Sequence, residues 1–172
     1  MTQQVQTEIT NHADNPLDHV EDVLTNHNWV FNRMTDEELM VEVSGRSCKY
    51  RLLFVWQDDM SALQFCAQYD LNVQSDKMDE AAKAVMGINE ALWMGHFEIP
   101  SDTRTPAFRQ TCLFRGMGGG SHAEKIEDLV DISLAQCERY YAVFYVLANA
   151  ASNDAMDGSD LSLAMMDIAG ES

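Results

Sequence analysis

Apolar and polar residues alternate with a period of two through most of the middle of the chain, which is the pattern of half-buried β-strands. The alternation begins at Trp29 and is interrupted by short polar turns. The segments that it predicts to be strands are 29–33, 39–43, 48–57, 62–70, 93–99 and 107–115. The first four are joined by connections too short for a parallel crossover, so they must pair antiparallel.

Helical spacing of apolar residues precedes, interrupts and follows these strands. The stretch NPLD at 15–18 has the capping asparagine, the first-turn proline and the acid that are typical of a helix N-terminus. A second helix is expected to start at a cap at Ser75 or Asp76. A long third helix is predicted through 126–144 and a short last one at 161–168.

Together these elements predict an α+β fold, with a single antiparallel β-sheet of about six strands and helices packed on one face. We find no internal repeat and no domain boundary, and 172 residues are enough to bury a sizeable core. We therefore expect one domain over 15–172. Residues 1–14 are polar and lack the basic and apolar segments of a secretion signal, so we expect a loosely ordered tail there.

The alternation divides the strands into two faces. One face is an apolar core of Trp29, Phe31, Leu39, Val41, Val43, Tyr50, Leu52, Phe54, Trp56, Leu63, Phe65, Tyr69, Phe97, Ile99, Phe108, Cys112 and Phe114. The other mixes polar and apolar residues: Asn32, Met40, Glu42, Lys49, Arg51, Leu53, Val55, Gln64, Cys66, Gln68, His96, Glu98, Arg109, Thr111 and Leu113. The mixture fits an interaction surface, but also an ordinary exposed face, since over half of a typical folded surface is apolar.

The net charge of −17 restricts the partners that the chain can bind. A field of this sign repels the phosphate backbone and no basic run offsets it, so we expect no binding to nucleic acid. Anionic membrane surfaces are disfavoured for the same reason, and no apolar run approaches the roughly 20 residues of a membrane-spanning helix. We expect a cytoplasmic protein.

The segment RGMGGGSHAEKIEDLV at 115–130 places glycines between a strand and a helix, where phosphate-binding loops often lie. It lacks the Lys-Ser/Thr pair of a Walker loop, and its match to the looser dinucleotide fingerprint does not lie in a parallel βαβ unit. Acids in the first turns of the helix would repel a phosphate, and Ser121 with Glu124 fits a capping box. We interpret the glycines as a flexible connector.

No other group of residues forms a recognisable catalytic or metal site. His19 and the aspartates beside it imitate a metal pair, but no third ligand follows at suitable spacing. Cys66 or Cys112 could pair with His96 as nucleophile and base; the sequence leaves this open, although buried structural cysteine is the usual case. We expect no metal, no cofactor and no enzymatic activity.

Four motifs occur in a fixed order between Trp29 and Leu147. They are Trp29-x-Phe31-x-Arg33, Tyr50-Arg51-Leu52-x-Phe54-x-Trp56, Asn89-Glu90-x-Leu92-Trp93-x-Gly95-His96-Phe97 and Glu138-Arg139. In this combination they resemble the YbjN-type family of bacterial proteins. The resemblance implies a fold like that of the dimeric type III secretion chaperones, no established enzymatic activity, and a role as a sensory-transduction or stress regulator. The chain departs from the family pattern at 148–158, so no role is carried over to that segment.

The sequence therefore predicts a non-catalytic, cytoplasmic protein-binding module, chaperone- or adaptor-like, that forms a homodimer. We expect it to hold an unidentified protein partner, extended or acidic, on the mixed face of the sheet or along its helices. The residues predicted to contact that partner are Arg51, Leu53, Val55, His96, Glu98 and Arg109. The plainer interpretation of two of them is that Arg109 and Glu98 only pair with each other across adjacent strands.

Two other functions stay open from the sequence. The chain could bind a small molecule, or act as an enzyme, through the loop from Gly116 to His122 together with His96 and Arg109. That function requires a closed pocket beside the loop. The chain could also be a structural subunit of a larger assembly that is unstable alone.

Overall fold

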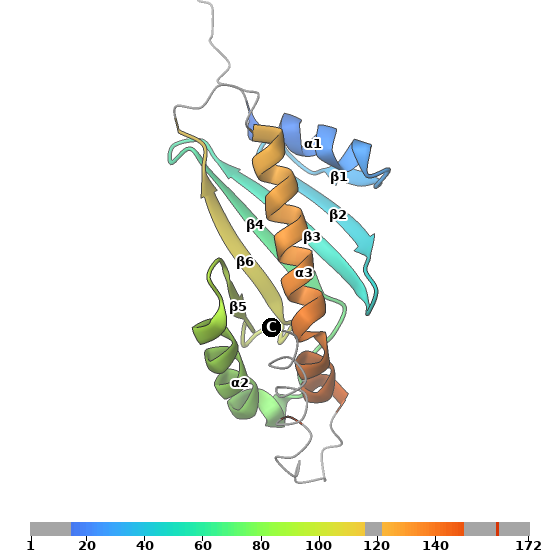
Figure 1. The fold of residues 1–172 in the computed structure, drawn as a ribbon, viewed down its shortest axis with the longest axis vertical. Helices are drawn as coiled ribbons and strands as arrows, with labels where there is room; N and C mark the ends of the chain where they lie inside the picture. The colour runs from blue at the N-terminus through green and yellow to red at the C-terminus, as the bar shows by residue number, and fades with distance from the viewer. Residues whose placement is uncertain (1–14, 116–121, 150–160, 162–172) are drawn as a thin grey trace, which may run out of the picture.

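The structure, a computed structural model, describes residues 15–115, 122–149 and 161. Figure 1 shows how its elements are arranged. In chain order they are α1 (Pro16–Asn26), β1 (Phe31–Arg33), β2 (Glu38–Ser44), β3 (Lys49–Gln57), β4 (Ala62–Tyr69), the 3₁₀ turn η1 (Ser75–Lys77), α2 (Met78–Ala91), β5 (His96–Glu98), β6 (Ala107–Leu113) and α3 (His122–Asn149). The predicted tail at 1–14, the glycine run at 116–121, most of the divergent 148–158 segment and most of the expected last helix lie outside the described residues.

The strands form one antiparallel sheet in the order β1-β2-β3-β4-β6-β5, which confirms the predicted α+β fold. β1 and β5 are shorter than the alternation predicted. β1 starts late because the Trp29 amide donates to the Leu24 carbonyl at 3.0 Å, which closes the end of α1. β5 starts only after Gly95, whose φ of +67° turns the chain.

The predicted N-terminal caps of two helices can be compared with the structure. Asn15 caps α1 as expected, and its side-chain oxygen accepts from an amide of the first turn at 3.0 Å. The cap predicted at Ser75 or Asp76 is wrong, because neither η1 nor α2 begins with a side-chain capping bond. Gln74 holds this start instead, since its side-chain amide donates to the Ala148 carbonyl at 3.0 Å. A contact with the distant end of α3 therefore replaces a local cap.

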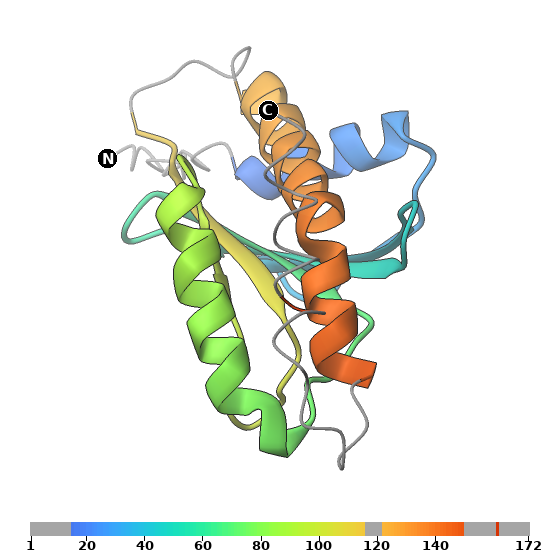
Figure 2. The ribbon, with the colours of Figure 1, turned by 60° about the horizontal axis from the view of Figure 1, so that its bottom comes forward.

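All of the described helices cover the same face of the sheet, and α3 runs across it (Figure 1, Figure 2). The strand residues predicted for the core point toward these helices. Most are buried, whereas Trp29, Phe31, Ile99 and Cys112 are half-buried at the margin of the core. The predicted assignment of faces is confirmed.

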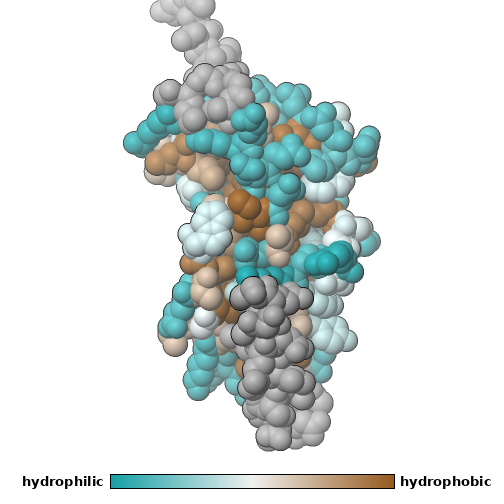
Figure 3. Space-filling view, in the orientation of Figure 1, coloured by the Kyte–Doolittle hydropathy of each residue, from teal (hydrophilic) through white to brown (hydrophobic). Residues whose placement is uncertain are grey.

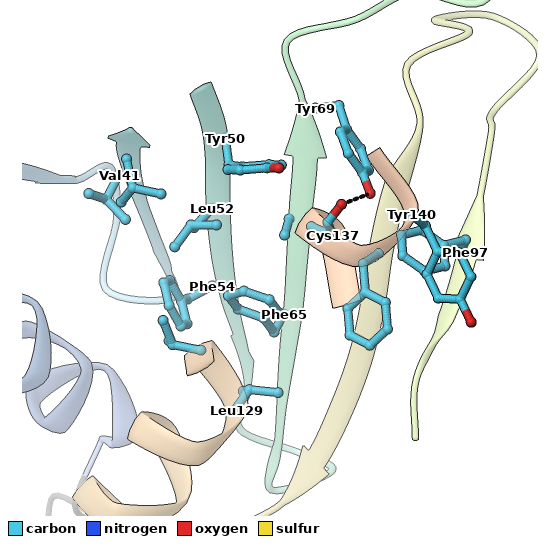
Figure 4. Close-up of a cluster of buried hydrophobic side chains, with 14 of the residues drawn as sticks. Val41, Tyr50, Leu52, Phe54, Phe65, Tyr69, Phe97, Leu129, Cys137 and Tyr140 are labelled. Carbon is cyan, nitrogen blue, oxygen red and sulfur yellow. Dashed lines mark hydrogen bonds between the residues drawn. The ribbon is translucent and has the colours of Figure 1, made fainter. Parts of the chain in front are cut away.

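Aromatic side chains join the sheet to α3 (Figure 4). The ring of Phe97 on β5 lies 5.5 Å from that of Tyr140 and 5.3 Å from that of Phe144. In the interior, the Tyr69 hydroxyl donates to the Cys137 carbonyl at 2.7 Å. Burial raises the pKa of both the Tyr69 hydroxyl and the Cys137 thiol, so both groups stay uncharged in the core.

β5 lies at one edge of the sheet, where backbone groups without a partner could pair with another strand. The side chain of Asn89 on α2 occupies the two groups of Phe97 that face outward. Its amide donates to the Phe97 carbonyl at 3.0 Å, and its oxygen accepts from the Phe97 amide at 2.8 Å. The Asn89 side chain therefore makes the two hydrogen bonds that a neighbouring strand would otherwise make to Phe97.

We expect Asn89→Ala to lower the free energy of unfolding by about 1–3 kcal/mol, because two part-buried backbone groups would lose their partners. Urea denaturation followed by circular dichroism measures the change. Glu90→Ala, at the exposed neighbouring position, is the matched control and should alter the free energy by less than about 0.5 kcal/mol. An Asn89 variant as stable as this control would mean that water replaces the side chain without cost.

Candidate functional site

The six residues predicted to contact a partner all lie on the face of the sheet that turns away from the helices. They are Arg51, Leu53, Val55, His96, Glu98 and Arg109. Three of them alternate along β3 with buried residues, and the others lie on β5 and β6. We call this side the open face; it consists of these six residues and their cross-strand neighbours Glu38, Met40, Glu42, Gln64, Cys66, Gln68 and Ala107.

Charged groups of β5 and β6 form a small cluster on the open face. Arg109 donates to a carboxylate oxygen of Glu98 at 3.2 Å and to the side-chain oxygen of Gln64 at 3.4 Å. His96 lies directly opposite Arg109 in the strand register, with its Nε2 atom 3.9 Å from the second Glu98 oxygen. Arg109 and Glu98 therefore pair across adjacent strands, as the plainer interpretation expects, but Arg109 also contacts Gln64. Exposed pairs of this kind contribute about 0–1 kcal/mol, so a partner could compete for these groups.

Arg51 lies apart from this cluster. β4 separates its strand from that of Arg109, and two strand spacings amount to roughly 10 Å. Arg51 pairs with Glu42 at 3.4 Å, and both side chains are more than half exposed. Leu53 and Cys66 occupy the row that leads to Arg109. The open face therefore offers two separate cationic positions with half-buried residues between them.

The nucleophile pairs considered from the sequence are not assembled. β6 separates Cys66 from His96, and Cys112 packs against the core, on the side of the sheet opposite to His96. Burial raises the pKa of Cys66 to about 11, so its thiol is protonated at neutral pH. Neither cysteine is poised for attack.

The sheet also separates the residues of the alternative small-molecule site, which was predicted to combine the Gly116 to His122 loop with His96 and Arg109. His122, the first residue of α3, is buried on the helix side, with its ring 4.9 Å from that of Phe114. His96 and Arg109 lie on the open face. A ligand would have to cross the sheet to touch all three residues, so this combination is not brought together.

Among the described residues, no group of three His, Cys, Asp or Glu side chains is placed to hold a metal ion. Asp18, which stands beside His19 in the imitated metal pair, instead accepts from Arg33 at 2.7 Å. Glu21 accepts from the same guanidinium at 2.9 Å, so that Arg33 links β1 to α1.

Of the helices that the structure describes, none has both the length and the apolarity needed to cross a bilayer.

The surface is hollowed beside α2 and at one end of the open face. A largely apolar groove of about 620 Å³ is lined by Met78, Ala82, Val85, Met86, Asn89, Glu90 and Ile99. Hydrophobic residues show among hydrophilic ones on that side (Figure 3, lower left). A polar pocket of about 470 Å³ lies at the end of β2, β3 and β4. Neither hollow is lined by His96 or Arg109.

Similarity to known proteins shows which family this chain is related to. One protein-family model matches residues 16–145, which is most of the chain. The chain belongs to the YbjN family. That family is described as "putative bacterial sensory transduction regulator". Among solved structures, the chain is similar to YbjN of E. coli, titled "a putative transcription regulator", with 11% identity over 73% of this chain and 93% of that chain and a TM-score of 0.48. No curated protein matches it.

Several of the residues that carry the YbjN resemblance maintain the fold. Asn89 and Gly95 shape the edge strand β5, and Glu138 on α3 binds the turn between β2 and β3. Arg51 and His96 differ from these, since both lie on the open face. The YbjN motifs therefore combine a structural framework with part of the candidate site.

Proposed function

We propose that this YbjN-family protein is a non-catalytic, cytoplasmic protein-binding module, chaperone- or adaptor-like, that takes part in stress or sensory-transduction regulation. It works as a homodimer, in the manner of a type III secretion chaperone, and holds a protein partner on its open face. One observation carries the proposal: all six predicted contact residues lie on the side of the sheet that none of the described helices covers.

The chemistry of the open face suits an extended or acidic segment of a partner. Arg51 and Arg109 offer planar N–H donors to carboxylates or backbone carbonyls. Arg51 is held by Glu42, and Arg109 by Glu98 and Gln64. The side chains of the two arginines are 52% and 42% exposed, so little stability is lost when a partner replaces the present acceptors. Leu53, in the same row as Arg109, and Val55, two residues farther along β3, supply apolar contact.

The charge-reversing double variant Arg51→Glu/Arg109→Glu should recover at least about tenfold less partner from native lysate than the wild type, because losing charged contacts typically costs 2 kcal/mol or more. Affinity capture with quantitative mass spectrometry measures the recovery. Size-exclusion chromatography with light scattering should show the same dimer for both proteins, which separates lost partner binding from lost assembly.

Lys83→Glu/Arg115→Glu is the matched control, since it makes the same change in net charge at two exposed positions outside the open face. It should recover the partner as the wild type does. Equal recovery by the open-face variant and the wild type would exclude this face as the binding surface.

A further inference from the structure

The polar pocket at the end of the open face has the dimensions of a ligand site. Its volume of about 470 Å³ lies within the roughly 300–1,000 Å³ of pockets that hold small molecules. Glu42 on β2, Lys49 and Arg51 on β3 and Asp70 just after β4 line its floor. The loop between β5 and β6 contributes Thr103 to its wall.

The loop that forms this wall is fixed to the end of β4. The Asn72 side chain donates to the Thr103 carbonyl at 2.8 Å and to the Thr105 hydroxyl at 3.1 Å. The Val73 amide donates to the Arg104 carbonyl at 2.9 Å. Arg104 itself has a φ of +55°, which a residue other than glycine keeps only where its surroundings impose it. The wall is therefore formed before any ligand binds.

Positive and negative groups alternate across the floor. Lys49 and Arg51 are two residues apart on β3 and so point to the same side of the sheet. Glu42 flanks them from β2 and is already paired with Arg51 at 3.4 Å. Asp70 flanks them from the other side, where its amide donates to the Lys49 carbonyl at 3.2 Å. Within the described part of the chain, the side chains of Lys49 and Asp70 form no hydrogen bond or ion pair.

This charge pattern discriminates between ligands. A purely anionic ligand would meet Glu42, Asp70 and the field of a chain with a net charge of −17. A purely cationic ligand would meet Lys49 and Arg51. A ligand that carries both charges can place each of them against an opposite charge, and the polar wall offers further hydrogen-bonding groups.

We propose that the pocket binds a small zwitterion, of the size of a free amino acid or a dipeptide. The carboxylate of the ligand lies between Lys49 and Arg51, and its ammonium group lies against Asp70. This site goes beyond the proposed function, because it requires neither a protein partner nor a dimer.

The test is a thermal-shift screen of the purified full chain against each standard L-amino acid and glycylglycine, followed by calorimetric titration. At about 100 times its dissociation constant, a binding probe should raise the Tm by roughly 5–10 °C. The N-acetyl and carboxamide derivatives of that probe each lack one charge, and they should produce no shift. A screen in which no probe raises the Tm overturns the proposal, as does equal binding of the singly charged derivatives.

Two variants locate the site. Lys49→Met and Asp70→Asn should each weaken binding of the probe at least about tenfold. Their Tm without probe should stay near the wild-type value, because neither exposed side chain forms a hydrogen bond or ion pair within the described part of the chain. Lys83→Met on the exposed surface of α2 is the control and should bind as the wild type does. Undiminished binding by both pocket variants would place the zwitterion elsewhere and overturn the proposal.

The result of the zwitterion screen can be distinguished from the result of the partner capture. Lys49→Met and Asp70→Asn lie outside the six predicted contact residues, so they should recover the protein partner normally. If no zwitterion binds and the Arg51→Glu/Arg109→Glu variant still loses its partner, the pocket proposal fails and the proposed function stands. If a zwitterion binds at Lys49 and partner recovery is unaffected by the double variant, the pocket proposal stands and the proposed function fails.

Discussion

Replacing Gly95 with alanine should lower the free energy of unfolding by about 2–5 kcal/mol, the largest effect that we expect from a single substitution in this protein. Gly95 has a φ of +67°, a conformation that costs an L-residue about 1–2 kcal/mol. A Cβ atom there would also overlap the ring of Phe108 and lie 2.9 Å from the Arg109 carbonyl oxygen.

Phe108 cannot move aside cheaply, because it is fully buried and its ring packs 5.2 Å from that of Phe97. Overpacking of a core in this way typically costs about 1–3 kcal/mol in addition to the backbone strain. Urea denaturation measures the sum. A loss this large is a substantial part of the roughly 5–15 kcal/mol that stabilise a domain.

Gly87→Ala is the matched control for Gly95→Ala. Gly87 lies inside α2, where alanine is favoured over glycine, so the same chemical change should raise the free energy of unfolding by about 0.5–1 kcal/mol. Opposite signs at the two glycines would attribute the loss at Gly95 to its turn and its contacts. A Gly95 variant within about 0.5 kcal/mol of the wild type would contradict the geometry of that turn.

Glu138→Ala should produce the second large loss, about 2–3 kcal/mol at neutral pH, measured by the same denaturation. The Glu138 carboxylate accepts from the Arg46 amide at 2.8 Å and from the Ser47 hydroxyl at 2.6 Å. It also accepts from the Ser47 amide at 3.3 Å. One side chain of α3 thereby holds the turn between β2 and β3, and hydrogen bonds to charged groups are worth about 1.5–3 kcal/mol.

The contribution of Glu138 should depend on pH. Partial burial raises the pKa of its carboxyl group, but the hydrogen bonds from Ser47 and Arg46 lower it more, so the folded pKa is below the ordinary 4.5. A depressed folded pKa stabilises the protein above pH 4.5, and the stabilisation is lost as the pH falls through the folded value. The difference in unfolding free energy between wild type and Glu138→Gln should therefore be constant near neutral pH and shrink in acid.

Asp131→Ala is the control for Glu138, since Asp131 is an exposed acid on the same helix. It should change the free energy of unfolding by less than about 0.5 kcal/mol. If the Glu138→Gln difference stayed the same in acid, the charge of the carboxylate would not be what stabilises the turn.

The alternation of residue types accounts for how well the faces of the sheet were predicted. Side chains along a strand point to alternate sides, so one buried position assigns its neighbours as well. Leu52 was predicted for the core and is fully buried, and this placement puts Arg51 and Leu53 on the other face. The short turns likewise required the first four strands to pair as hairpins, as they do.

Features that depend on distant segments could not be predicted in this way. The alternation does not say which strand lies beside β4 after α2 intervenes, so the position of β5 at the edge was not predicted. Gln74 gave no capping signal, because its partner is 74 residues away at Ala148. The polar pocket was also missed, since it joins Asp70 to Thr103 through a loop whose path is set by hydrogen bonds to Asn72, which follows β4.

Residues a few positions apart in the chain were enough to specify strands, helix faces and the mixed composition of the open face, because these features follow from local backbone geometry. The separation of His122 from His96, the distance between Arg51 and Arg109, and the charged pocket arise only when β6 pairs with β4 and α3 packs across the sheet. Those arrangements are stabilised by burial of side chains from segments far apart in sequence, and no local pattern encodes them.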